Sequence, residues 1–253
     1  MMLRSIALAA MAATSIGAQA ALLFDQNVTS NVIYGSGNSN GGFTVDNGGG
    51  IELGLRTHRR FPTPSDNAAG IGSNGDGTYD QGAGQVGSGL TRRALWVFDW
   101  SINSGTANVD AYTYKLGIDF SAGFGTNFLV FDPVNQPCLD NSFGNSTTLA
   151  NAGVEAAACS SAANIAAYAA LTANNSLVQN SWDLDFFDDG THPFDPNANG
   201  NYSIYLEAYR SNALVARTEI TVIVGTGAVP EPGSLALAGL ALAGIGALRR
   251  RKS

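Results

Sequence analysis

The sequence is poor in charged residues and contains very few cysteines and histidines. Charged residues make up 13% of the 253 residues, about half the usual share of roughly 25%. The two cysteines have no C-x-x-C spacing and there are only two histidines, which argues against a zinc or redox centre. Hydrophobic residues still account for 45% of the chain, so this is not the composition of a disordered protein.

Basic residues are scarcest between the two ends of the chain. Five of the 13 basic residues lie at the ends of the chain, namely Arg4 and residues 249–252. One of the 20 acidic residues, Glu231, also lies there. Residues 21–229 therefore carry 8 basic and 19 acidic residues, a net charge near −11. Because such a domain repels phosphate backbones, we do not expect a nucleic-acid partner. The acidity suits a soluble secreted protein, or one that collects cations.

The first twenty residues have the three parts of a secretory signal peptide. Arg4 follows the initial Met-Met-Leu, residues 6–16 are apolar, and Ala18-Gln19-Ala20 forms an A-x-A cleavage site. The apolar run is too short to span a bilayer as a helix of the mature protein. We therefore expect cleavage after Ala20, with Ala18 and Ala20 as the small residues of the cleavage site.

The last 25 residues predict a short membrane anchor. Residues 233–248 carry no charge and would span about 24 Å as a helix, slightly less than the roughly 30 Å hydrocarbon core. Local bilayer thinning and arginine snorkelling can cover the difference. Four cationic residues follow directly and should stay cytoplasmic, which puts the main domain outside. They are Arg249, Arg250, Arg251 and Lys252.

A proline-containing motif separates this helix from the rest of the chain. It consists of Val229, Pro230, Glu231 and Pro232. The motif, the short apolar helix and the basic end together resemble the PEP-CTERM sorting tail of Gram-negative bacteria, also called the C-terminal module of ice-binding proteins. The resemblance implies processing near this motif by a membrane peptidase of the exosortase type. It also implies an inner-membrane-anchored precursor and later release to the cell surface, with exopolysaccharide as a possible partner.

The middle of the chain, residues 21–228, predicts an all-β domain. Runs that alternate apolar and polar residues are typical of half-buried strands. We expect strands over residues 22–28, 43–45, 51–56, 95–102, 112–120, 128–131, 182–187, 202–209 and 215–224. An alanine-rich run over residues 164–171 predicts the one clear helix. Many strands and little helix favour an antiparallel β-sandwich of the jelly-roll type. This middle part also resembles the uncharacterised ectodomains that often precede such tails, and that resemblance implies no site residues.

The two cysteines predict a disulfide bond. Cys138 and Cys159 are separated by a turn-rich segment, and an isolated pair outside the cytoplasm favours a bond. Closing this loop would contribute roughly 3 kcal/mol by chain-entropy reckoning.

One acidic segment fits the start of a calcium-binding loop. Asp195, Asn197 and Asn199, followed by Gly200, match the D-x-[DN]-x-[DN]-G pattern. The twelfth position is Leu206 rather than glutamate, and a strand is expected to follow instead of a helix. A plain turn that leads into the strand explains the same residues, so both interpretations stay open.

Catalytic residues are harder to find. Asp183 and Asp185 should share one face of the strand predicted over 182–187, and His192 lies nearby, but no spacing selects a catalytic pair. His58 is expected in a basic surface turn. Three tryptophans could form a sugar-stacking platform or belong to the core: Trp96, Trp100 and Trp182.

Two functions from different classes follow from these observations. The first is a non-enzymatic surface or matrix protein that has a structural role or binds glycan. The second is a secreted carbohydrate-active enzyme. An ice-binding surface would need a regular array of threonines, whereas Thr218 and Thr221 fall on opposite faces of their strand.

Overall fold

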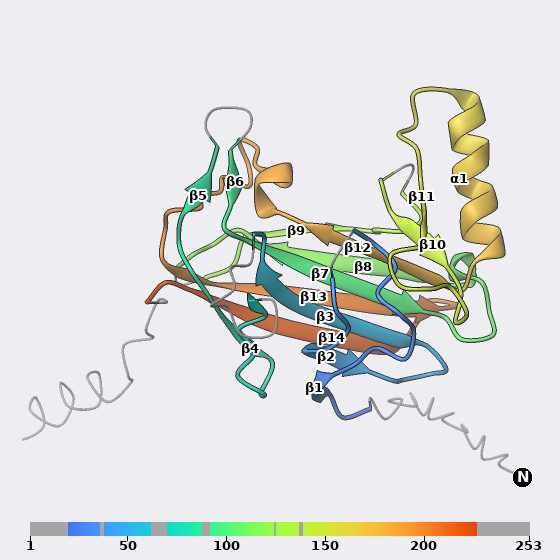
Figure 1. Ribbon diagram of the computed structural model, residues 1–253, viewed down its shortest axis with the longest axis horizontal. Coiled ribbons are helices and arrows are strands. Elements are labelled where there is room, and N and C mark those ends of the chain that lie inside the picture. Colours follow the sequence, from blue (N-terminus) through green and yellow to red (C-terminus); the bar gives the residue numbers. More distant parts are fainter. Residues whose placement is uncertain are drawn as a thin grey trace, which may run out of the picture.

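The computed structural model describes residues 20–35, 38–61, 70–87, 92–123, 125–136 and 139–226. These residues form two large β-sheets that lie against each other, with one α-helix at one end and a short two-stranded ribbon at the other (Figure 1). The prediction of an all-β fold is therefore confirmed. The finer expectation of a jelly roll stays a prediction.

The larger sheet has seven strands, all of them antiparallel to their neighbours. In spatial order they are β1 (Leu23–Gln26), β2 (Phe43–Asp46), β3 (Glu52–Arg59), β7 (Trp96–Asn103), β12 (Leu177–Trp182), β10 (Ser142–Gly144) and β11 (Val154–Glu155). The two-stranded ribbon pairs β5 (Gln85–Val86) with β6 (Arg93–Ala94).

The smaller sheet has five strands, in the order β4 (Thr78–Gln81), β14 (Ala213–Val224), β13 (Gly200–Arg210), β8 (Thr113–Asp119) and β9 (Phe128–Phe131). Its pairings are antiparallel except that β4 runs parallel to β14. The expected antiparallel arrangement therefore has one exception, at this edge. A long connection from β4 to β14 makes a parallel pairing possible, since only a tight hairpin requires antiparallel neighbours.

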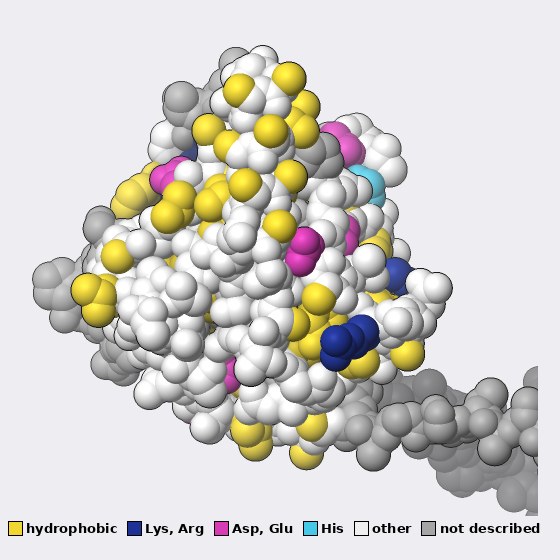
Figure 2. All heavy atoms as spheres, turned by 90° about the vertical axis from the view of Figure 1, so that its right-hand side faces the viewer, with side chains coloured by type: hydrophobic (Ala, Val, Ile, Leu, Met, Phe, Trp, Pro, Cys, Tyr) yellow, Lys and Arg dark blue, Asp and Glu magenta, His cyan; other side chains and the backbone are white. Residues whose placement is uncertain are grey.

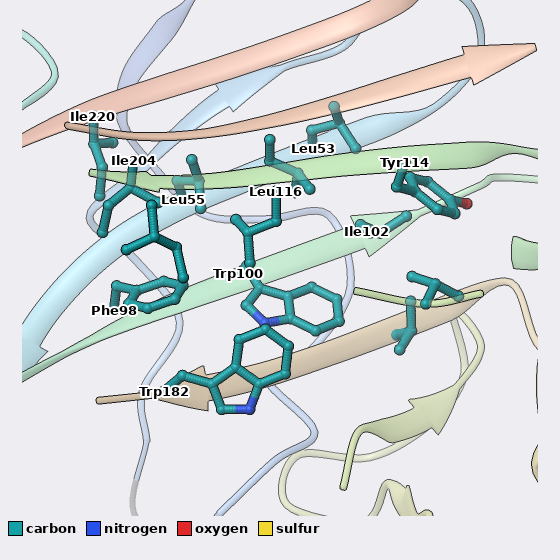
Figure 3. Close-up of a cluster of buried hydrophobic side chains, with 14 of the residues drawn as sticks. Leu53, Leu55, Phe98, Trp100, Ile102, Tyr114, Leu116, Trp182, Ile204 and Ile220 are labelled. Carbon is teal, nitrogen blue, oxygen red and sulfur yellow. The ribbon is translucent and has the colours of Figure 1, made fainter. Parts of the chain in front are cut away.

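The core lies between the two sheets and is built by alternation along their strands. From the larger sheet, Leu53, Leu55 and Trp100 point inward, and Leu116 and Ile204 meet them from the smaller one (Figure 3). All five are fully buried. The ring centroids of Trp100 and Trp182 lie 5.2 Å apart. Trp96 is buried as well, so the expectation that the tryptophans belong to the core is confirmed and the alternative of a sugar-stacking platform is wrong.

The hairpin between β13 and β14 fixes the register of the smaller sheet. Ser211 and Asn212 connect the strands with φ of 50° and 64°, as a two-residue type I′ turn requires. Arg210 therefore pairs with Ala213. Along β14 every second residue, from Ala216 to Val224, is buried, so Thr218 is buried and Thr221 is on the opposite face, as expected.

Helix α1 (Ala162–Asn174) confirms the helix predicted over residues 164–171. Ser161 caps it by accepting a hydrogen bond from the Asn164 backbone N–H. Tyr168 anchors the helix by donating from its hydroxyl to the Val134 carbonyl at 2.8 Å. The rest of the helix is mostly exposed alanine. Figure 2, which faces this end of the molecule, shows hydrophobic side chains and few charged ones over it.

The outer face of the seven-stranded sheet is covered by the N-terminal segment (residues 27–35 and 38–41). Val28 packs where Gly54 lacks a side chain, since a Cβ there would lie 2.8 Å from Val28 Cγ1. The Glu52 carboxylate accepts hydrogen bonds from the Thr29 backbone N–H and hydroxyl, each at 3.0 Å. Further along, Gln179 accepts from the backbone N–H of Ile33 at 2.8 Å. Polar side chains of the sheet thus bind this segment through its backbone.

A buried ion cluster lies under the same segment. Arg56 Nε donates to Asp99 Oδ2 at 2.6 Å, and both side chains are almost inaccessible, at 2% and 0% exposed. The Arg56 guanidinium also donates to the carbonyls of Ser39 and Gly41, at 2.8 and 2.7 Å. On the other side of Asp99, His58 Nε2 lies 3.2 Å from Oδ1. The cluster therefore joins β3 and β7 to the N-terminal segment.

The position of His58 differs from the expected basic surface turn, so that interpretation is wrong. His58 lies within β3, and its side chain is 11% exposed. The strand continues to Arg59 because residues 52–59 pair with β7 along their whole length. Consecutive charged residues indicated a surface turn, but Asp99 on the facing strand compensates the buried charge.

The charge of His58 depends on its two neighbours. Its Nδ1 lies 2.8 Å from the Arg59 carbonyl oxygen, which assigns a hydrogen to Nδ1. In the neutral ring the lone pair of Nε2 would then face the Asp99 carboxylate, so a proton on Nε2 is favoured. Burial lowers the pKa of His58, but the charge of Asp99 outweighs it and raises the pKa above 6.5.

We expect the free energy of unfolding to fall as the pH rises above about 6.5. Since the folded pKa of His58 lies above the unfolded one, its contribution is complete below that pH and is lost as the pH passes the folded pKa. Urea unfolding between pH 6 and 9, on wild type and His58→Gln, measures this. In the variant, the free energy of unfolding should lack the pH dependence that His58 contributes. Other titrating groups, including Asp183, are present in both proteins and so do not account for the difference between them. Identical slopes would contradict the assignment.

Most other expected strands are confirmed, but the one predicted over residues 182–187 is wrong. β12 ends at Trp182, and η4 (Leu184–Phe187) follows as a 3₁₀ helix. Asp183 caps it, because Oδ1 accepts a hydrogen bond from the Asp185 N–H at 3.0 Å. Asp183 and Asp185 consequently do not alternate along a strand.

Candidate functional site

The outer face of the five-stranded sheet gathers aromatic and charged side chains. In β13 the odd-numbered residues point away from the core, whereas Ile204, Leu206 and Ala208 are buried in it. Neighbouring strands add residues at matching positions. We call this set the tyrosine face; it consists of Lys115, Gly117, Phe128, Tyr205, Glu207, Tyr209, Arg217 and Glu219.

Tyr205 lies at the centre of the tyrosine face, and its ring covers Gly117. A Cβ at position 117 would meet the ring at 2.1 Å, so only glycine lets the ring lie flat on the sheet. Phe128 lies beside it with ring centroids 5.3 Å apart, and the Arg217 guanidinium lies 4.4 Å from the Tyr205 ring centroid. These contacts give the ring a defined position.

Polar groups surround the ring. The Tyr209 hydroxyl donates to Glu207 at 2.6 Å, and Arg217 donates both to Glu207 and, at 2.7 Å, to Glu219. Lys115 Nζ lies 4.9 Å from the Tyr209 ring centroid. Burial, followed by the hydrogen bond to Glu207, raises the pKa of Tyr209 to about 12. This hydroxyl therefore stays protonated and remains a donor at neutral pH.

This arrangement can stack an apolar ring face and hydrogen-bond to groups around it. Cross-strand aromatic and ion pairs stabilise any sheet by a few tenths of a kcal/mol to about 1 kcal/mol each, so such pairs alone do not define a site. A ring that lies flat on the sheet, with hydrogen-bond donors and acceptors at its edge, is what an amphipathic ligand such as a sugar requires. The alternation of Tyr205, Glu207 and Tyr209 is visible in the sequence, but the positions of Gly117 and Arg217 beside them depend on strand pairing, which no local pattern shows.

The acidic residues after β12 form a second cluster. Arg92 donates to Asp185 at 3.0 Å and to Asp188 at 2.9 Å, and Arg60 lies 3.4 Å from Asp183. Burial is the main cause that raises the pKa of Asp183 to about 7. The sequence pointed to these acids but missed the two arginines, which are about ninety or more positions away.

His192 lies apart from these carboxylates. Its Nδ1 is 3.3 Å from Asp189 Oδ1, and its ring packs 5.5 Å from that of Phe120. Within the described ranges, no three His, Cys, Asp or Glu side chains are placed to hold a metal ion.

The residues of the calcium hypothesis form a turn. Asp195 Oδ1 accepts hydrogen bonds from the Asn197 backbone N–H at 3.0 Å and from its amide at 3.3 Å. The Asn199 amide donates to the Thr226 hydroxyl at 3.1 Å. Asp195 and Asn197 contact each other, whereas Asn199 turns toward the end of β14. The turn interpretation accounts for these contacts, and calcium binding stays a prediction.

Several predicted sites lie outside the described residues. They include the signal peptide with Ala18, the motif of Val229, Pro230, Glu231 and Pro232, the helix over 233–248 and the basic residues 249–252. No helix within the described ranges is both long and apolar enough to cross a membrane. Cys138 also lies outside them, so the bond to Cys159 stays a prediction; Cys159 itself has no free thiol.

Residues 228–252 match the PEP-CTERM protein-sorting motif. This match agrees with the resemblance of the tail. No curated protein and no solved structure matches the chain. The motif indicates an exported surface protein with a membrane-anchored precursor that is processed by exosortase, a membrane protein.

Proposed function

We propose that the β-sandwich is a non-enzymatic module that binds a glycan of the cell surface or extracellular matrix through the tyrosine face. The observation that carries this proposal is the Tyr205 ring, which lies flat over Gly117 among hydrogen-bond donors and acceptors. Export supports it, since a sorted surface protein meets polysaccharide outside the cell. An exopolysaccharide is the partner that this location favours.

Replacing Tyr205 with alanine should weaken glycan binding about tenfold, because it removes the stacking surface. Affinity electrophoresis of the purified full-length chain in gels containing dextran, xylan or galactomannan measures the effect. Gly117→Ala should weaken binding as well, since its Cβ displaces the ring without removing it. Gly123→Ala is the matched control, because nothing lies within 4 Å of a Cβ at that position.

Unchanged retardation in both Tyr205→Ala and Gly117→Ala would refute the tyrosine face as the binding site.

The second candidate, a carbohydrate-active enzyme, is favoured by the pKa of Asp183, which is suitable for a general acid. Its side chain is fully buried and caps η4, which favours a structural role. Hydrolysis of any tested glycan that is lost in Asp183→Asn would replace the binding proposal with the enzyme.

A further inference from the structure

A mixed aromatic and cationic patch lies at the opposite end of the molecule from α1, beside the two-stranded ribbon. It combines the end of β3, strand β6 and the orange 3₁₀ turn η4 next to β6 (Figure 1). Phe186 is 46% exposed and Phe61 is 58% exposed. Among the described residues no other aromatic side chain is as exposed, since those of the tyrosine face are half-buried, so the patch is unusual for this molecule.

Two guanidinium groups lie against the Phe186 ring. The Arg93 guanidinium is 4.7 Å from its centroid and that of Arg60 is 5.7 Å away. Arg60 also lies 5.8 Å from the centroid of Phe61. The aromatic rings thus hold the cations in place by cation–π contacts.

Arg93 is a cation without an acidic partner among the described residues. Its Nη1 donates to the Arg92 carbonyl at 2.6 Å, which leaves its other donors available. Arg92, in contrast, is neutralised by two carboxylates, those of Asp185 and Asp188. An anion that approaches Arg93 therefore replaces no existing ion pair.

Arg60 is also neutralised only in part. Its partner Asp183 lies 3.4 Å away, and burial raises the pKa of that carboxyl to about 7. Asp183 therefore carries a full negative charge only above neutral pH. Arg93, and Arg60 in part, therefore carry positive charge that no carboxylate of the described residues compensates, in a chain whose net charge is −7.

We propose that Arg93, Arg60 and Phe186 form a binding site for an acidic sugar, one whose carboxylate meets the guanidinium groups while its apolar face packs against the exposed part of the Phe186 ring. Planar guanidinium groups suit a carboxylate, which they can bind through two parallel hydrogen bonds. The choice of a sugar as the carrier of the carboxylate depends on the proposed glycan-binding function. The requirement for an anion does not, and the site is separate from the tyrosine face.

Polygalacturonate is the probe for this site, and dextran is its neutral counterpart. The purified full-length chain should bind polygalacturonate about tenfold more weakly after Arg93→Gln, while its retardation by neutral glycans stays unchanged. Arg93→Lys keeps the charge but loses the planar fork, so it should fall between wild type and Arg93→Gln. Phe186→Leu should also weaken binding, because it removes the stacking ring.

Arg210→Gln is the matched control, since Arg210 is an exposed arginine that lies 5.5 Å from the centroid of another ring, that of Tyr112. It should leave polygalacturonate binding unchanged. Tyr205→Ala separates the two sites: it should weaken neutral-glycan binding and spare polygalacturonate. The proposal is overturned if Arg93→Gln binds polygalacturonate as wild type does. Equally strong binding of a short single-stranded oligonucleotide, lost in the same variants, would also overturn the acidic sugar.

Discussion

Replacing Asp99 with asparagine should lower the free energy of unfolding by about 3–5 kcal/mol, because it leaves a buried cation without its partner. Arg56 would keep its charge in a site where 2% of its side chain is exposed. Burial alone would raise the pKa of Asp99, but the charges of His58 and Arg56 hold it well below its usual range. The carboxylate is therefore ionised at any pH at which the protein works, and asparagine cannot replace its charge.

Thermal unfolding followed by circular dichroism measures the effect. A loss of this size should lower the melting temperature by about 6–20 °C in a domain of this length. The exposed Asp110 supplies the matched change, and Asp110→Asn should leave the melting temperature within error of wild type. An Asp99→Asn variant that loses less than about 1 kcal/mol would show that the cluster is not fully desolvated.

A double variant separates the cost of an unpaired charge from the value of the pair. Arg56→Met combined with Asp99→Leu removes both charges and keeps similar volume. It should be more stable than Asp99→Asn alone, because apolar replacements of a buried pair are often close to neutral. The remaining loss then reports the hydrogen bonds from Arg56 to the carbonyls of Ser39 and Gly41, together with the lost contact between His58 and Asp99.

Local patterns in the sequence predicted much of the fold. Alternation gave β8, β9, β13 and β14 to within a few residues, since a half-buried strand shows its own period. The alanine-rich run likewise gave α1. These elements follow from neighbouring residues, which a single sequence displays directly.

The features that could not be predicted from the sequence depend on contacts between residues that are distant in the chain. His58 looked exposed because its neighbours are basic, and only the pairing of β3 with β7 brings Asp99 to it. Trp182 looked like the start of a strand, although it is the last residue of one. The patch at Phe186 joins residues more than ninety positions apart. No local period reports such contacts, since tertiary packing decides them.

The tail is the part where sequence alone predicts a large functional effect. Replacing Glu231 with glutamine should abolish release of the protein and leave the full-length precursor in the membrane. Glu231 lies between two prolines, which favour an extended backbone that a peptidase can reach. The substitution changes neither the apolar run nor the basic residues, so the predicted anchor is retained while the processing site is altered.

Membrane fractionation and immunoblotting, in a host that carries the sorting machinery, follow both forms of the protein. Wild type should give a membrane-bound precursor and a shorter released form that lacks residues 233–253. Glu155→Gln, an identical change at an exposed residue of β11, is the control and should be released normally. A variant in which Arg249, Arg250, Arg251 and Lys252 are replaced with serine should behave differently. Without the cytoplasmic stop, the orientation of the anchor is no longer fixed and unprocessed precursor passes through the membrane. Wild-type protein that stays full-length in the membrane of such a host would leave a plain anchor and contradict processing at the motif.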